Sequence, residues 1–319
     1  MTDTKASPRV SILIPVYNRE NLIAECIESA LLQTYLDFEV VVVDNASDDG
    51  TWKICQQFAA RDPRVRAFRN NRNIGPVRNW RRCAEQARGE FVKILFSDDT
   101  LELNCLAEMV PELEDPDVAL VYCAARIGRS KDRSRTDYSL GNAVRLDSTK
   151  FINLILCGDA PVSPGAIVIR TKDLIANLHT NFPTATPRPF DAHGAGPDVM
   201  ISLLTAGSYS CVVHLSTPLV FFRAHSGSFS VSNTRNQISQ GYRSALSHYL
   251  IEERGRASWM RYLADEWLRE LRFDRKWIQP RQYLIEYEGS GQLSEQCAFT
   301  FYALLSLLTR LWGGKLNYV

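Results

Sequence analysis

Short apolar runs that alternate with segments of helical periodicity constrain the fold of this chain more than any other feature. The first four runs lie at residues 10–14, 39–44, 65–69 and 91–96. Apolar runs of this length are typical of strands buried on both faces, and strands that alternate with helices build a parallel sheet. The sequence therefore predicts an α/β fold with a mostly parallel sheet flanked by helices.

The segments between these runs carry helix signals. Apolar side chains recur on one face of residues 22–31, and a polar turn precedes residues 51–60. Pro76 and Gly89 suit the beginning and the end of a third helix. From residue 236 on, the pattern predicts helices alone. Before that point it predicts these further elements: helices at 101–113 and 198–206, a strand at 118–125, and one or two strands within 208–222.

The chain of 319 residues is long enough for one large α/β domain with an appendage. Its hydrophobic fraction of 45% and charged fraction of 23% are those of an ordinary globular protein. We expect an α/β domain at 1–235 and a helical C-terminal region at 236–319. Within the domain, residues from about 8 to 125 form a regular half and residues 126–235 a less regular one.

Charge and cysteine usage exclude several classes of protein. The 37 Lys and Arg residues against 36 Asp and Glu leave a formal charge of +1. The protein therefore has no overall positive field that would attract nucleic acid. The eight cysteines form no CxxC pair and no zinc-type cluster, and they indicate reduced thiols. Residues 1–9 lack the apolar core of an export signal, and the longest apolar stretch, 298–308, is shorter than the about 20 residues of a membrane span. We therefore expect a cytoplasmic protein.

Acidic side chains follow two of the predicted strands. Asp98 and Asp99 come directly after the fourth apolar run, and Asp44 ends the second. Ligands of such sheets bind at the carboxyl ends of the strands, where carboxylates can hold Mg²⁺ or Mn²⁺ together with phosphate oxygens. A carboxylate at Asp44 can also accept the imino N–H of uracil or thymine. The alternatives are a helix cap with a solvated turn residue for Asp98 and Asp99, and an Asx-turn for Asp44.

Three segments in order resemble glycosyltransferase family 2, with its GT-A fold: 10–18 (VSILIPVYN), 43–51 (VDNASDDGT) and 73–99, from Asn73-Ile74-Gly75 through Gly89-Glu90 to Asp98-Asp99. The resemblance covers about residues 10–113 and returns at 196–230. It implies a nucleotide-sugar half followed by an acceptor half.

The resemblance also implies roles for residues around the donor. Asp44 reads the base, and Pro15, Tyr17 and Arg19 line the nucleotide pocket. Arg78 matches a position near the diphosphate, although a solvated helix arginine is the alternative.

A divalent metal, Mn²⁺ or Mg²⁺, is implied as well. The first acid of the family's Asp-x-Asp motif falls at Phe96 here, so only Asp98 matches the metal-ligand acid and Asp99 is an adjacent helper. His225, in the segment 223–225, matches a histidine that completes the metal shell or contacts the diphosphate, and imidazole suits Mn²⁺ better than Mg²⁺.

Asp198 matches the acid that acts as catalytic base in the family, with Pro197 in place of the acid that commonly precedes it. A base is needed because a sugar hydroxyl is a poor nucleophile until it loses its proton. The alternative for Asp198 is a helix N-cap. The sequence therefore predicts an inverting, metal-dependent glycosyltransferase of bacterial surface glycan synthesis. The preferred donor is a UDP-sugar and the second choice is a dTDP-sugar. The acceptor is a hydroxyl of a glycan or of a lipid-linked glycan.

Two other functions stay open: a nucleotidyltransferase, although no P-loop or GxGxxG follows the first strand, and a non-catalytic module that only binds a nucleotide. The C-terminal helix at 299–312 has three alternatives. It packs on the catalytic domain, which we favour, or on a second subunit, or it lies on the inner membrane face.

Overall fold

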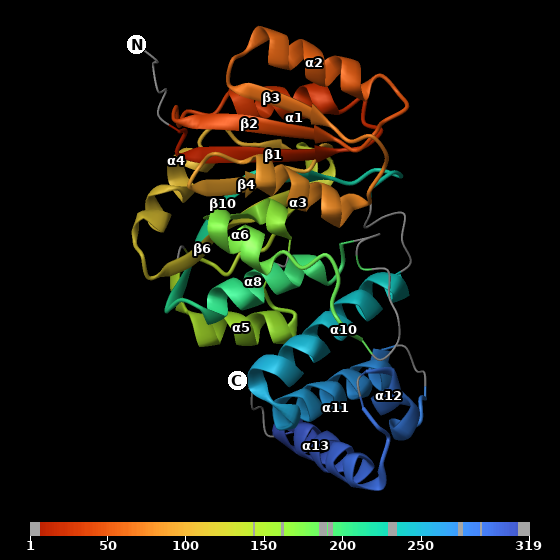
Figure 1. Cartoon of the computed structure of the whole chain (residues 1–319). Coiled ribbons are helices and arrows are strands. Elements are labelled where there is room, and N and C mark those ends of the chain that lie inside the picture. Colours follow the sequence, from red (N-terminus) through yellow and green to blue (C-terminus); the bar gives the residue numbers. More distant parts are fainter. Residues whose placement is uncertain are drawn as a thin grey trace.

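The computed structural model describes residues 7–142, 144–160, 163–184, 190, 194–228, 235–273, 277–287 and 289–311 (Figure 1). In its N-terminal half, four strands pair in parallel in the order β3-β2-β1-β4. These strands are β1 (Val10–Val16), β2 (Phe38–Asp44), β3 (Val65–Arg69) and β4 (Phe91–Ile94), and the helices between them are α1 (Ile23–Leu31), α2 (Thr51–Arg61) and α3 (Pro76–Gln86). Each of these elements was predicted from the sequence.

Helices cover both faces of this half of the sheet. Ile12 and Ile14 of β1 lie in one apolar cluster with Ile23 of α1, whereas Leu13 lies in a second cluster with Val77 of α3. Successive side chains of a strand point to opposite faces, so a strand covered on both sides must be apolar throughout. This explains why β1 and β2 are mostly apolar on both faces rather than alternating between apolar and polar residues.

The sheet continues beyond β4 with strands of both directions. In the residues that the structure describes it has ten strands, and its main path is β3-β2-β1-β4-β9-β6-β10-β5. The pairs β4–β9, β6–β9, β5–β10, β6–β7 and β8–β10 are antiparallel, and β6–β10 is parallel. The additional strands are β5 (Thr100–Leu101), β6 (Val118–Ser130), β7 (Arg133–Asp137), β8 (Val144–Asp147), β9 (Ile167–Arg170) and β10 (Cys211–Arg223).

The α/β fold with flanking helices is confirmed, but the sheet is mixed rather than mostly parallel. The reason is β9, which lies between β4 and β6 and runs opposite to both. Because two reversals restore the direction, β6 and β10 again run parallel to β1. The carboxyl ends of β1, β4, β6 and β10 therefore meet at one edge of the sheet.

The helix predicted at 101–113 is broken in the structure. Thr100 and Leu101 form β5, α4 spans Cys105–Met109, and a 3₁₀ turn spans Pro111–Glu114. Proline has no N–H to donate inside a helix, which accounts for the change at Pro111. The mixed half of the sheet is covered by α5 (Ser148–Cys157), α6 (Thr171–Asn177) and α8 (Pro197–Gly207), and α8 confirms the helix predicted at 198–206.

The C-terminal region is helical, as predicted, and packs on the sheet domain through its first helix. Its helices are α10 (Arg235–Arg254), α11 (Arg256–Phe273), α12 (Pro280–Glu286) and α13 (Leu293–Leu311). Figure 1 shows α11, α12 and α13 at the end of the molecule farthest from α2, with α10 between them and α8. Leu250 of α10 and Trp259 of α11 belong to the same apolar cluster as Leu203 of α8, so the two regions share a core. Within the described residues, none of the helices has the length and hydrophobicity needed to cross a bilayer.

Candidate functional site

A cavity of about 640 Å³ opens at the edge of the sheet where the carboxyl ends of β1, β4, β6 and β10 meet. Its walls come from these strand ends, from α3, from the first turn of α8 and from α10. Tyr17, Trp80, Asp98, Asp198, Phe222 and Tyr242 lie around it. Two acids that are 100 residues apart in sequence therefore face one space, as the sequence predicted.

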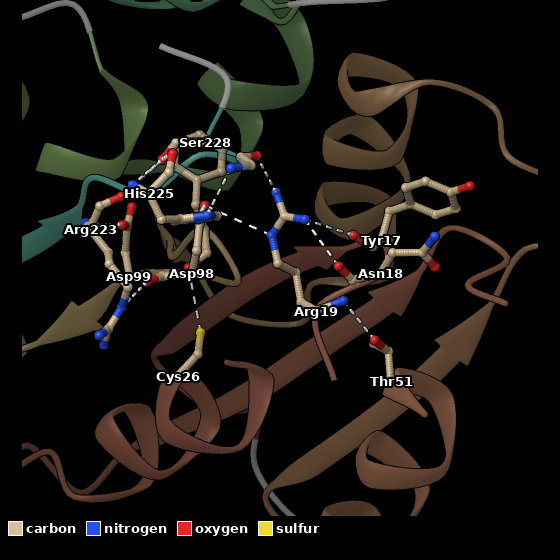
Figure 2. Close-up of polar contacts among 12 residues, drawn as sticks. Tyr17, Asn18, Arg19, Cys26, Thr51, Asp98, Asp99, Arg223, His225 and Ser228 are labelled. Atoms are coloured by element: carbon tan, nitrogen blue, oxygen red, sulfur yellow. Dashed lines mark hydrogen bonds and ion pairs between the residues drawn. The ribbon is translucent and has the colours of Figure 1, made fainter. Parts of the chain in front are cut away.

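Asp98 is the centre of a charged cluster on one side of the cavity (Figure 2). His225 Nε2 lies 2.9 Å from Asp98 Oδ2, and Arg19 Nε lies 3.8 Å from the same oxygen. Arg19 also donates from Nη2 to the Gly227 carbonyl oxygen at 3.0 Å, which connects the loop after β1 to the loop after β10. A carboxylate, an imidazole and a guanidinium are thus held together by three loops.

Asp98 and His225 fit part of a metal-ligand set. An octahedral ion with bonds of about 2.1 Å places neighbouring ligand atoms about 3 Å apart, close to the observed separation of the Asp98 oxygen and the His225 nitrogen. Across the described ranges, no group of three or more His, Cys, Asp or Glu side chains could hold a metal ion. These two residues can therefore supply two ligands, and the others would come from a bound substrate and water.

Asp99 has a different environment from its neighbour. It is buried, and its Oδ1 accepts the backbone N–H of Arg223 at 2.8 Å. Burial, reinforced by the nearby charge of Asp98, raises its pKa well above the usual value. The contact attaches the end of β10 to the turn after β4, so Asp99 holds together the two loops that carry Asp98 and His225.

Some of the other residues expected around the donor line the cavity, and one does not. Pro15, Tyr17 and Arg19 line the cavity, and the Tyr17 side chain is 41% exposed. Arg78 lies exposed in the first turn of α3 and is not among the residues around the cavity. The structure thus brings the residues of the β1 loop to the site and leaves Arg78 at its periphery.

Asp44 lies behind the cavity wall rather than on it. Its side chain is fully buried, and its carboxylate accepts hydrogen bonds from the backbone and hydroxyl of Ser47 and pairs with Arg69 Nε at 3.0 Å. The side chain thus shapes its own loop, as the alternative role proposed, although the backbone N–H that it accepts is three residues on rather than the two of an Asx-turn. The next residue, Asn45, does line the cavity. The role of Asp44 in reading a base stays a prediction.

Asp198 lines the cavity from the start of α8. The helix cap is Gly196, with φ of 118°, so Asp198 is not the N-cap. Its Oδ1 accepts the N–H groups of Gly196 and Val199, both at 2.8 Å, and its Oδ2 accepts the hydroxyl of Tyr242 at 2.7 Å. Burial raises its pKa to about 7, against the lowering effect of these hydrogen bonds. A carboxyl that titrates near neutral pH can accept a proton from a substrate.

Several residues around the cavity were not found from the sequence. Trp80 and Phe96 form an aromatic pair with ring centroids 5.3 Å apart, and Tyr138 packs edge-on against Phe222 at 6.2 Å. Tyr138 has φ of 65°, which is strained for a non-glycine residue and is a signal only coordinates reveal. Tyr242 lies inside a long predicted helix, where no sequence signal separates it from a core residue.

The fold and the site define a class: an α/β protein of GT-A type with a nucleotide-sized cavity at its strand ends. The solved structure of S. aureus TarS 1-349 in complex with UDP superposes with a TM-score of 0.57 and 18% identity, over 94% of this chain and 91% of that one. At this identity the likeness shows the fold. The model of the family "Glycosyl transferase family 2" matches residues 11–177, and the chain belongs to this family.

Curated relatives match between 34% and 38% of the chain. Chondroitin synthase of Escherichia coli is 40% identical over 124 residues, which are 38% of this chain and 18% of that protein. Glycosyltransferase GlyG of Streptococcus pneumoniae is 30% identical over 115 residues, or 36% and 38% of the two chains. A "GalNAc(5)-diNAcBac-PP-undecaprenol beta-1,3-glucosyltransferase" of Campylobacter jejuni is 33% identical over 109 residues, or 34% and 35%. The matched segment spans less than two-fifths of each of these three relatives.

Proposed function

We propose that this chain is an inverting glycosyltransferase that moves a sugar from a nucleotide-diphosphate donor to an acceptor hydroxyl. The observation that carries the proposal is the single cavity lined by both Asp98 and Asp198. Membership of the family and the glycosyltransferase names of the relatives support it. The donor half spans about residues 8–125, which include the N-terminal parallel strands, and the acceptor half spans residues 126–235, beginning within β6.

Asp198 acts as the general base. Its pKa of about 7 leaves an appreciable carboxylate fraction at neutral pH, together with enough basicity to take the proton of a sugar hydroxyl. The acceptor oxygen then forms a bond to the anomeric carbon while the bond from that carbon to the diphosphate oxygen breaks. A single attack from the face opposite the leaving group inverts the anomeric carbon.

The charged cluster around Asp98 receives the leaving diphosphate. The buried Nε of Arg19 lies 3.8 Å from Asp98 Oδ2 but donates no hydrogen bond to any of the described residues, and Arg223 donates from Nε to the Asp98 carbonyl oxygen at 3.1 Å. Positive groups fixed where negative charge develops stabilise a transition state. A divalent ion, Mn²⁺ or Mg²⁺, held by Asp98 and His225 would supply further neutralisation of the diphosphate.

The preferred donor is a UDP-sugar, followed by a dTDP-sugar, because uracil and thymine carry the same imino group. The TarS structures in complex with UDP and with UDP-GlcNAc support the first choice. The acceptor is a glycan or lipid-linked glycan whose sugar lies against the aromatic side chains between the two acids, which include Trp80 and Tyr138. The name of the C. jejuni relative, which contains an undecaprenol diphosphate glycan, supports an acceptor of this kind.

We place this activity on the inner face of the membrane, in bacterial surface glycan synthesis. One side of α13 packs on α11, while Phe301, Leu304 and Leu308 are 60%, 57% and 54% exposed. Residues 296–319 contain Arg310 and Lys315 and no acid, a charge that suits anionic lipid headgroups. A lipid-linked acceptor would be present at the same surface.

The test is a panel of nucleotide sugars incubated with the protein, Mn²⁺ and acceptor glycans, with the products identified. We expect release of free nucleoside diphosphate and a glycosylated acceptor of inverted anomeric configuration. Release of pyrophosphate instead would indicate a nucleotidyltransferase. Nucleotide binding without transfer to any acceptor would indicate a binding module and would contradict the proposal.

A further inference from the structure

Tyr242 connects the C-terminal helical region to the acid at the start of α8. It lies on α10, and its hydroxyl donates to Asp198 Oδ2 at 2.7 Å, at the edge of the cavity. Burial, followed by the charge of Asp198, raises the pKa of Tyr242 well above its usual value. The phenol therefore stays protonated and remains a donor over the whole range in which Asp198 titrates.

The backbone around this contact is built for close approach. A Cβ at Gly241 would lie 2.6 Å from the Ala195 carbonyl oxygen, and a Cβ at Gly196 would lie 3.2 Å from the Gly241 carbonyl oxygen. The distance of 2.6 Å is too short for any Cβ and the distance of 3.2 Å is tight, so glycine at 241 lets α10 contact the loop that leads into α8. This contact brings Tyr242 within hydrogen-bonding distance of Asp198.

The three hydrogen bonds to Asp198 fix the direction of its carboxylate. Gly196 and Val199 occupy Oδ1, and Tyr242 occupies one lone pair of Oδ2. Without the phenol, Oδ2 has no hydrogen-bond donor on the part of the chain that the structure describes. We propose that Tyr242 is a positioning residue that orients the base Asp198, and that the helical C-terminal region is in this way part of the active site. The inference rests on the proposed role of Asp198.

Several charged and titratable side chains lie near Asp198 and could influence its pKa. The charge of Asp198 acts on two titratable side chains, Tyr242 from α10 and Tyr138 from the segment after β7. Asp98, Asp99, Arg135 and Arg223 lie on other walls of the same cavity. Tyr242 is the one neighbour that donates a side-chain hydrogen bond to Asp198 among the described residues, so its removal should act on this carboxyl first.

The activity test compares Tyr242→Phe with Tyr249→Phe. Tyr249 is also buried on α10, but its hydroxyl accepts from Arg254 at 3.3 Å, away from the cavity. A hydrogen bond to a charged carboxylate favours the ionised form, so Tyr242→Phe should move the acidic limb of the kcat–pH profile upward by about one pH unit. At pH 6.5 kcat should fall roughly tenfold with the donor KM unchanged, because the Tyr242 hydroxyl donates to the proposed base rather than to a residue proposed to bind the donor. Tyr249→Phe should leave the profile in place.

A second measurement needs no substrate. The pKa of Asp198 in the folded chain lies above that of an exposed aspartate, so the folded state keeps a proton that the unfolded state releases, and stability falls as pH rises toward 7. Tyr242→Phe raises this pKa further, so its Tm should fall more at pH 8 than at pH 5. For Tyr249→Phe the fall should be equal at both. Gly241→Ala, which separates α10 from the loop, should act in the same direction as Tyr242→Phe.

The outcomes separate this inference from the proposed function. If Asp198→Asn abolishes transfer but Tyr242→Phe changes neither the pH limb nor the pH dependence of Tm, the positioning role is wrong and the function stands. If the wild-type protein transfers no sugar, the proposed function is wrong, whatever the Tm data show. A shift that Tyr249→Phe reproduces would also overturn the positioning role, since it would reflect a general loosening of α10.

Discussion

Four carboxylates near the proposed site differ in environment rather than in type. Asp98 is partly exposed beside a histidine and an arginine, whereas Asp99 is tied to the backbone of β10. Asp198 is buried at a helix start, and Asp44 is enclosed by its own loop. Environment determines which of them can bind a cation, accept a proton or only shape a loop.

Replacement of Asp198 by Asn tests the base directly. The amide has the same shape but cannot accept a proton, so kcat should fall by about 10²–10⁴-fold while donor binding changes little. In the wild type, kcat should decline as the pH falls below about 7, because the folded-state pKa is raised and the protonated form is inactive. The measurements are kcat over pH 5–9 and donor affinity by calorimetry. A variant with near-normal turnover would remove Asp198 from the mechanism.

Replacement of His225 by Ala tests the metal site. If His225 supplies a ligand beside Asp98, the Mn²⁺ concentration for half-maximal activity should rise roughly tenfold or more, equivalent to about 1.4 kcal/mol of binding free energy. His179→Ala is the matched control, because His179 is exposed and is not among the residues around the cavity. Full activity of the wild type in excess chelator would show that the pair serves no metal.

At this scale the sequence located the acids but not their partners. Asp98 was found because a strand end is visible as a pattern, and Asp198 was found because its segment resembles the one that carries the base in the family. Tyr242 and Tyr138 were missed because their roles come from tertiary contacts and from a strained φ, neither of which leaves a periodic signal. The enclosure of Asp44 by Arg69 was likewise invisible, since it depends on the register between β2 and β3.

Among the elements, the turn between α3 and β4 offers a sharp test of close packing. A Cβ at Gly89 would lie 2.6 Å from the Ser11 nitrogen and the Val10 carbonyl carbon, and the Gly89 N–H donates to Ser11 Oγ at 2.9 Å. Gly89→Ala should therefore force β1 and this turn apart and lower the free energy of unfolding by about 1–3 kcal/mol, measured by urea denaturation.

The matched control for this variant is Gly207→Ala at the end of α8, where a Cβ would meet no atom within 4 Å. Alanine restricts the unfolded chain more than glycine does, so this change should be neutral or stabilise by up to about 1 kcal/mol. Equal stability losses for the two variants would contradict the packing argument. A loss confined to Gly89→Ala would confirm it.

Elements with strong periodicity were predicted well, and the short or irregular ones were not. The βα units up to β4 were predicted from apolar runs and helix signals. In these units the tertiary contacts agree with the local sequence preferences. The segment 101–113 has a helical apolar pattern, but pairing of Thr100–Leu101 with β10 and the proline at 111 divide it. The strand β9 lies within the irregular segment 126–197, where no strand was predicted, and its direction opposite to β4 and β6 makes the sheet mixed.

For the whole molecule, the shared core of α8, α10 and α11 makes the C-terminal helices part of one structure with the sheet. Buried Asp265 of α11 accepts the hydroxyl of Ser306 at 2.7 Å, which fixes the orientation of α13 on α11. The helix predicted at 299–312 corresponds to α13, which packs on α11 and α12, whereas α10 is the helix that contacts α8 of the sheet domain. Direct packing of this helix on the catalytic domain, which the sequence analysis favoured, is therefore not confirmed. Phe301, Leu304 and Leu308 of α13 remain exposed to solvent. Their spacing of three and four residues places them on one face of the helix.

That face should bind anionic membranes. Two exposed leucines inserted into a bilayer contribute about 3 kcal/mol or more, and basic residues add attraction that salt weakens. Leu304→Gln combined with Leu308→Gln should therefore reduce sedimentation with phosphatidylglycerol vesicles at least tenfold, whereas Leu36→Gln, at an exposed leucine before β2, should not. Neutral phosphatidylcholine vesicles should bind less protein. The membrane role would be contradicted if the wild-type protein bound neither kind of vesicle. If, in addition, the wild type were a dimer and the double variant a monomer, this face would be the contact with a second copy of the chain.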